Sequence, residues 1–221
     1  NEFSVKNTDV SLTLGSIEST DTVPSEPLYW KILLDEIDFE NVGFALKMPQ
    51  DSLFVRTMLP KTTLKNGVID LKEASYYVKS FGIDNAELAY GPKEELFLQQ
   101  IGLQLDSIYY CGKDIRANIE EFVLKERSGL ELVSTEGRIV SDSVLIEIPK
   151  FTMKTTASSL DLQTKIGWDV LEMKKTGVLS ARINAEIGKG DVAKILGGRD
   201  TLFLQTYPNK PFVFRADAEG D

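Results

Sequence analysis

Apolar and polar residues alternate with a period of two along much of the chain. Val10, Leu12 and Leu14, for example, alternate with Ser11 and Thr13. Because successive side chains of a β-strand point to opposite faces, this spacing predicts strands with one apolar and one wet face. The same alternation recurs at positions 42–48, 101–105, 115–119, 158–162 and 181–187.

Residues that favour turns separate these runs. They are Asn66-Gly67, Tyr90-Gly91-Pro92, Ser128-Gly129 and Pro208-Asn209. Many short strands at roughly even spacing, joined by turns, predict an all-β architecture. Positions 18–27 are polar, contain two prolines and lack periodicity, so we expect a loop or linker there.

Two short segments suggest helices. Asp191 is placed to cap a helix over 191–196, and Gly197-Gly198 would end it. Residues 92–95, a proline followed by a lysine and two glutamates, suggest a second helix, although the strand pattern returns at Ile101.

The apolar positions change parity around three asparagines, Asn7, Asn41 and Asn85. A straight strand would send its second apolar set to the opposite face, so the change predicts a bulge or corner at each asparagine. Asparagine tolerates the left-handed conformation that such corners often need. The same switch, without asparagine, occurs from Ile119 to Phe122 and between positions 153 and 160.

Strand–corner–strand units added one after another would lay their apolar sides into one continuous trough. The spacing between the units is irregular, so the pattern does not indicate a solenoid with a fixed repeat. An ordinary closed sandwich or barrel core is the alternative that the pattern leaves open.

The composition narrows the function classes. The 221 residues suffice for one large β-domain or two small ones. The net charge of -9 argues against a nucleic-acid partner, because neutralising phosphates needs clustered Lys and Arg. It also disfavours docking on an anionic lipid surface through a basic patch, but it leaves contact with lipid tails open. No apolar stretch approaches the roughly 20 residues of a membrane-spanning helix.

Catalytic and metal chemistry have few candidates. The chain has no histidine, the commonest general base and transition-metal ligand, and Cys111 is its only cysteine. Glu36, Asp38 and Glu40 would line one face of a strand and be solvated there, on the side opposite the intervening apolar residues. We therefore expect no catalytic residues, no metal site and no cofactor.

Several phrases of the sequence resemble a known family. They are LKERSGLEL at 124–132, TTASSLDL at 155–162, AEIGKGDVAKIL at 185–196 and the DNAEL corner at 84–88. Together they look like the AsmA/TamB-like proteins, in the form found in Bacteroidetes-type bacteria. The likeness spans most of positions 30–200, and its motifs are degenerate because they record groove geometry.

The resemblance implies a long, twisted, taco-like β-sheet that extends through the periplasm from an inner-membrane anchor. The concave face of such a sheet is apolar, and family members are implicated in carrying phospholipid to the outer membrane. Some members are implicated in assembling outer-membrane and secreted proteins. On this basis, residues 1–221 are expected to be a single all-β segment of a larger periplasmic protein.

The expected partners are phospholipid acyl chains, bound on the concave face. Two alternatives remain: a module whose sheet edge templates strands of outer-membrane β-barrel or secreted proteins, and a closed-core structural domain. An interrupted sheet would also leave unpaired backbone through which the segment could dimerise. The residues predicted to line the lipid groove are Phe39, Phe44, Leu46, Ile83, Leu88, Leu103, Leu105, Ile119, Phe122, Leu124, Leu160 and Leu162.

Overall fold

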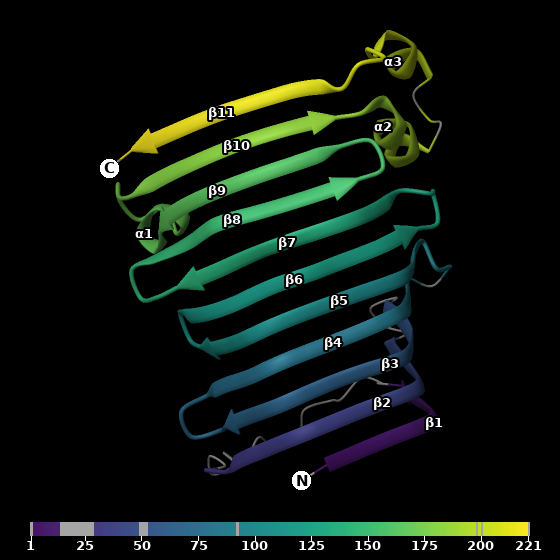
Figure 1. The fold of residues 1–221 in the computed structure, drawn as a ribbon, viewed down its shortest axis with the longest axis vertical. Helices are drawn as coiled ribbons and strands as arrows, with labels where there is room; N and C mark the ends of the chain where they lie inside the picture. The colour runs from purple at the N-terminus through teal and green to yellow at the C-terminus, as the bar shows by residue number, and fades with distance from the viewer. Residues whose placement is uncertain are drawn as a thin grey trace.

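The computed structural model describes residues 2–13, 29–48, 53–91, 93–197, 199 and 201–220, and the loop predicted at 18–27 lies outside these ranges. The described residues form one open sheet of eleven strands with three short helices (Figure 1). The prediction of an all-β, twisted, elongated sheet that curls into a groove is confirmed.

From β2 onward, the strands become shorter along the chain. Strands β2 and β3 have 18 residues each, whereas β9, β10 and β11 have 9. At a rise of about 3.3 Å per residue, the strands span about 60 Å at one end of the sheet and about 30 Å at the other. The strands are β1 (Glu2–Thr13), β2 (Lys31–Met48), β3 (Leu53–Asp70), β4 (Ser75–Tyr90), β5 (Leu96–Cys111), β6 (Asp114–Glu126), β7 (Glu131–Ser141), β8 (Leu145–Thr155), β9 (Ser159–Gly167), β10 (Leu179–Ile187) and β11 (Phe212–Gly220).

The spatial order of the strands is their order in the sequence. Each strand from β2 onward pairs antiparallel with the next, and only β1 and β2 run parallel. Strands β1 and β11 therefore form the two free edges, at opposite ends of the sheet (Figure 1). A parallel neighbour needs a long connection, and positions 14–30 separate β1 from β2.

The three predicted asparagine corners are confirmed. Asn7, Asn41 and Asn85 have φ angles of 50°, 54° and 55°, and each strand continues on both sides of its asparagine. Asn7 and Asn41 lie side by side, because their neighbours on both sides are paired, and the Asn41 Nδ2 donates to Asn7 Oδ1 at 3.3 Å. Left-handed residues inside strands bend them and increase their twist. Because the two asparagines lie side by side, β1 and β2 bend at the same place, and the sheet is bent along this line.

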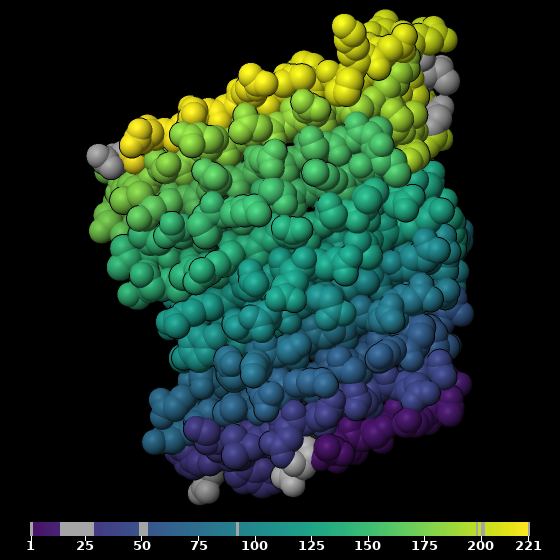
Figure 2. Space-filling view, in the orientation of Figure 1, coloured from purple at the N-terminus to yellow at the C-terminus, as the bar shows by residue number. Residues whose placement is uncertain are grey.

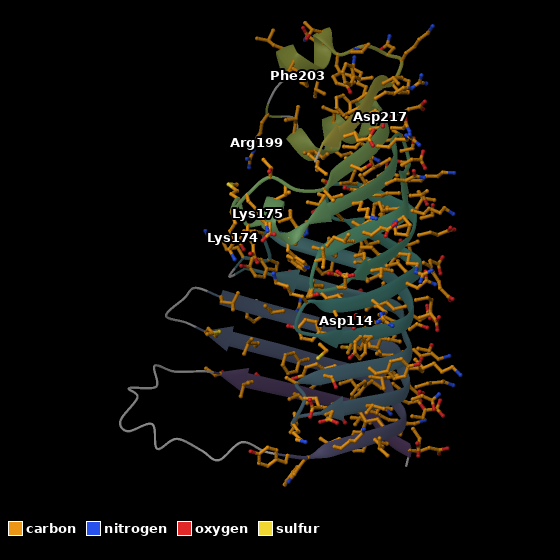
Figure 3. The ribbon with its side chains drawn as sticks, turned by 90° about the vertical axis from the view of Figure 1, so that its left-hand side faces the viewer. Asp114, Lys174, Lys175, Arg199, Phe203 and Asp217 are labelled. Carbon is orange, nitrogen blue, oxygen red and sulfur yellow. The ribbon has the colours of Figure 1, made fainter. Side chains whose placement is uncertain are left out.

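Further left-handed residues lie inside neighbouring strands. Asn66 in β3, and Gln100 and Ser107 in β5, have φ angles of 51°, 53° and 55°. The prediction of a turn at Asn66-Gly67 is therefore wrong, since both residues lie inside β3. A Cβ on Gly67 would lie 3.0 Å from Leu64 Cδ2, so this glycine permits close packing within the sheet. Figure 3 shows the result: the strands at the β1 end bend sharply, and one arm of each reaches away from the main wall of the sheet.

The other three turn predictions are confirmed where the structure describes them. Gly91 and Gly129 have φ angles of 91° and 87° and lie in the β4–β5 and β6–β7 connections. Pro208-Asn209 lies between α3 (Thr201–Thr206) and β11. Pro92 is outside the described residues.

The helix predictions are partly right. Helix α2 (Lys189–Leu196) exists and ends at Gly197 in the left-handed conformation, with φ 56°. It begins two residues earlier than predicted, so its N-cap is Gly188 and Asp191 lies in the first turn. The helix expected at 92–95 is absent from the described residues 93–95, where the Glu94 N–H donates to Gly91 O in a turn. Helices α1 (Trp168–Leu171) and α3 were not predicted.

Asp191 attaches α2 to the hairpin between β8 and β9. Its buried carboxylate accepts hydrogen bonds from the hydroxyls of Thr155, Ser158 (2.6 Å) and Thr156 (3.3 Å). Burial alone would raise the pKa of Asp191, but these hydroxyl donors outweigh burial and hold the pKa below its ordinary value. The contact fixes helix α2 against residues 155–158 of the β8–β9 hairpin.

Candidate functional site

The strand register places distant apolar residues on one face of the sheet. Phe39 lies opposite Thr62, which lies opposite Ile83, Leu103 and Phe122 in turn across β2 to β6. Residues directly opposite each other on neighbouring strands share a face. This row therefore runs across five strands on a single side of the sheet.

A second row continues on the same side toward β11. Leu105, two residues from Leu103, lies opposite Ile119, and the row continues through Gly137, Phe151 and Leu162. Both Ile119 and Phe122 belong to this side, so the predicted parity switch between them is confirmed.

The remaining predicted residues join the same side through the outer arm of the sheet. Phe44 lies opposite Thr57, followed by Leu88, Leu98 and Glu126. Glu126 is two residues beyond Leu124 on β6 and so shares its face. All twelve predicted groove residues thus lie on one side, which we call the apolar face. Further apolar residues of this face, found only through the register, include Phe3, Val5, Val10, Leu12, Ile37, Val42, Phe81, Ile101, Phe151 and Ile183.

The apolar face is open. Eleven of the twelve predicted residues are half-buried, and Phe44 is exposed at 37%. Within the described ranges, the only fully buried apolar residues are Val42, Ala86 and Ala89. A sandwich or barrel would bury most of its inward-facing side chains. The alternative of a closed core is therefore wrong for the part of the chain that the structure describes.

The opposite face is polar. Lys6, Glu40, Lys61 and Asp84 lie opposite one another in a row of alternating charge across β1 to β4. The Lys6 Nζ lies 2.6 Å from a Glu40 oxygen, and this hydrogen-bonded pair raises the pKa of Lys6 and lowers that of Glu40. Figure 3 shows nitrogen- and oxygen-tipped side chains, Asp217 among them, along the outer side of the sheet.

The acidic run on β2 belongs to this polar face. Glu36 and Asp38 lie opposite Glu2 and Ser4, and Glu36 forms an ion pair of 2.8 Å with Lys65. The predicted placement of these carboxylates, opposite the apolar residues of the same strand, is confirmed. No group of three His, Cys, Asp or Glu residues able to hold a metal ion occurs within the described ranges.

Two hollows of the sheet are shallow and bordered partly by polar residues. One of about 530 Å³ lies on the polar side between Lys6, Glu40 and Lys61. Another of about 370 Å³ is lined by residues of both faces, among them Val10 and Phe44 together with Arg56. Charged side chains border both. The apolar face is therefore a broad open trough, shaped by the curl of the sheet, and it differs from an enclosed ligand pocket.

Two buried hydroxyls interrupt the apolar face. Thr62 and Thr135 are buried, and the Oγ1 atom of each has no hydrogen-bond partner. Both belong to the apolar face, because Thr62 lies opposite Phe39 and Thr135 lies opposite Met153, which lies opposite Leu160. Sequence reasoning missed these residues because a threonine in an alternating run reads equally well as a wet-face residue.

The chain matches no protein-family model, no curated protein and no solved structure at a significant level. The resemblance to the AsmA/TamB-like family therefore stays a prediction from the sequence. None of the helices in the described residues is both long enough and apolar enough to cross a bilayer.

Proposed function

We propose that the apolar face binds phospholipid acyl chains and lets them move along the sheet. In this proposal, the chain is a non-catalytic segment of a periplasmic protein that is anchored in the inner membrane and carries phospholipid between the inner and outer membranes. The observation that supports it is a continuous apolar face, from β1 to β11, that no other layer of the described chain covers.

The chemistry of the face suits a hydrocarbon ligand. An acyl tail needs an apolar surface and offers no group for specific polar contacts. Burying each CH₂ stabilises the complex by about 0.8 kcal/mol, so even a partly covered tail is held by several kcal/mol. Because this attraction is non-directional, a tail can shift from one strand to the next without breaking a specific contact.

The direction in which the apolar face runs also supports movement of a lipid tail from one end of the sheet to the other. Its rows cross the strands, so the path runs across ten inter-strand spacings from β1 to β11, a distance of about 50 Å at about 4.8 Å per spacing. The corners at Asn7, Asn41 and Asn85 bend β1, β2 and β4, so at this end of the path the two arms of each bent strand face a tail lying between them (Figure 3).

A matched pair of variants tests the proposal. Phe44→Glu places a charge on the apolar face at the one predicted groove residue whose side chain is exposed, at 37%. Ser11→Glu adds the same charge on the polar face, since Ser11 lies opposite Ala45, the neighbour of Phe44. Native mass spectrometry would show co-purified phospholipid, and a fluorescent fatty acid would report uptake.

We expect the wild type and Ser11→Glu to carry lipid and to take up the probe. Phe44→Glu should weaken uptake at least about ten-fold, because a charge held against a tail loses its hydration. The same circular dichroism spectrum for all three proteins would show that the fold survives. A wild-type protein without lipid and without uptake would refute the proposal.

A second function is favoured by the β11 edge. Strand β11 contains no lysine, proline or left-handed residue, whereas β1 contains Lys6 and the corner at Asn7. Apart from the charges of Arg215, Asp217 and Glu219, the β11 edge is unguarded. Such an edge is a template for another strand, such as that of an outer-membrane or secreted β-protein, or of a second copy. This function uses the β11 backbone, so Phe44→Glu would leave it intact. The same variant therefore separates the two functions.

A further inference from the structure

The charge of the chain is unevenly distributed. Positions 187–215 contain five cationic residues and two acidic ones, a local net charge of +3 in a chain whose net charge is -9. This segment, which we call the basic tip, comprises the end of β10, the helices α2 and α3, and the start of β11. The cations are Lys189, Lys194, Arg199, Lys210 and Arg215.

The basic tip also exposes large apolar side chains. Leu202 on α3 is 75% exposed and Ile195 on α2 is 69% exposed. Phe203 on α3 is 46% exposed. Phe212 and Phe214 on β11 are about half-exposed and belong to the β11 end of the apolar face, since Phe214 lies opposite Ala185, which lies opposite Leu160. In a soluble protein, the helices and strands at the end of a sheet normally point such side chains inward. An exposed apolar patch surrounded by polar residues marks an interaction site.

Tyr207 holds the parts of the basic tip together. Its hydroxyl donates to Ile187 O at 2.9 Å, and Lys189 Nζ donates to Tyr207 O at 3.3 Å. The rings of Phe203 and Tyr207 meet edge to face at 5.7 Å. Helices α2 and α3 are in contact, and Ile187 lies opposite Phe212. These contacts join the end of β10, the helices α2 and α3, and the start of β11.

The basic tip occupies one corner of the molecule. It lies where β10 and β11 meet α2 and α3, at the upper right of Figure 1 and Figure 2. Figure 3 shows Arg199 on the side toward which the strands curl, away from Asp217 on the polar face. A flat surface can approach this corner, because no other element of the described chain lies beyond it (Figure 2).

We propose that the basic tip docks on the surface of an anionic lipid bilayer. Leucine, isoleucine and phenylalanine side chains enter the boundary between headgroups and tails, while lysine and arginine attract acidic headgroups. The net charge of the whole chain disfavours such contact, but charges beyond about 10 Å are screened at ordinary ionic strength, so the local charge decides. A protein partner would need a surface that is acidic, apolar and complementary in shape. An anionic bilayer is acidic and apolar and needs no complementary shape. Docking through Ile195 on α2 and Leu202 on α3 does not depend on lipid binding in the trough, since both residues lie outside the strands.

Sedimentation with lipid vesicles tests the proposal on the full chain. Vesicles of phosphatidylglycerol and phosphatidylethanolamine supply the anionic surface, and vesicles of phosphatidylcholine supply the neutral one. One variant combines Ile195→Glu with Leu202→Glu. The matched control combines Val144→Glu with Met173→Glu, two exposed apolar residues near the α1 end of the strands.

We expect the wild type and the control to bind anionic vesicles at low salt and to dissociate as salt rises. The tip variant should bind at least about ten-fold more weakly, because it removes apolar contact and adds charge repulsion. It should still take up the fluorescent fatty acid, whereas Phe44→Glu should still bind vesicles, so the two proposals can fail separately.

Three results would overturn docking. The first is equal binding to anionic and neutral vesicles, and the second is unchanged binding of the tip variant. The third is a wild-type dimer that ignores vesicles and dissociates in the tip variant, which would make the basic tip a contact between two copies. Unchanged thermal unfolding of both variants would show that they remain folded.

Discussion

The corner at Asn85 offers a direct test of why the sheet curls. Asn85 is exposed, has a φ of 55° and interrupts the register between β4 and β5. A left-handed backbone costs an ordinary L-residue about 1–2 kcal/mol, more for a β-branched side chain, and costs glycine almost nothing. We therefore expect Asn85→Gly to change the free energy of unfolding by a few tenths of a kcal/mol. Asn85→Val should lower it by about 1–2 kcal/mol.

Urea denaturation followed by circular dichroism measures the difference between the two variants. Valine favours regular strands, so Glu87→Val, at an exposed position of the same strand, controls for valine itself. We expect the midpoint of Asn85→Val alone to fall, and fatty-acid uptake to fall with it if the corner shapes the trough. Equal midpoints for Asn85→Val and Asn85→Gly would refute the view that left-handed residues set the corner.

Two further changes test the polar groups that the structure buries. Asp191→Asn should destabilise the protein by about 1–3 kcal/mol at neutral pH, because the amide cannot accept all three hydroxyl hydrogen bonds. Since the folded-state pKa of Asp191 is lowered, its contribution is present above the ordinary value of 3.8 and is lost as the pH falls below it, so the wild type and variant should converge in acid thermal melts. Thr62→Val removes a buried hydroxyl without a partner, so thermal unfolding should show no loss and up to about 1 kcal/mol of gain. A clear loss of stability would mean that the Thr62 hydroxyl has a partner.

The sequence was most informative where a local signal and the long-range pairing agree. Alternation predicted parts of β1, β2, β5, β6, β9 and β10, and the twelve predicted groove residues all lie on the apolar face, because the period of two survives whatever the neighbouring strand is. The asparagine corners were visible for a similar reason. A parity change inside an apolar run leaves few conformations that keep the run on one face.

The sequence was misleading where the local signal has two structural solutions. An Asn-Gly pair is typical of a hairpin turn. In β3, however, Asn66 bends a continuous strand, and Gly67 leaves room for the side chains of Leu34 and Leu64. Pairing with β2 and β4 on both sides decides between these solutions, and a single sequence does not contain that information. The parallel pairing of β1, the helices α1 and α3, and the basic tip arise from the same kind of long-range contact.

A one-layer sheet exposes its apolar face to water, which costs free energy. The packing of neighbouring side chains lowers this cost but does not remove it. Apolar neighbours about 5 Å apart on adjacent strands shield one another, which explains why eleven of the twelve predicted groove residues are half-buried although no other layer of the described chain covers them. The charged rows on the opposite face oppose stacking of one sheet upon another through that side. What remains exposed is apolar area, and any ligand that covers this area in the folded state shifts the folding equilibrium toward that state. An open apolar face is therefore consistent with a protein whose most stable form includes its ligand, and a mobile hydrocarbon covers such a face without fixing its shape.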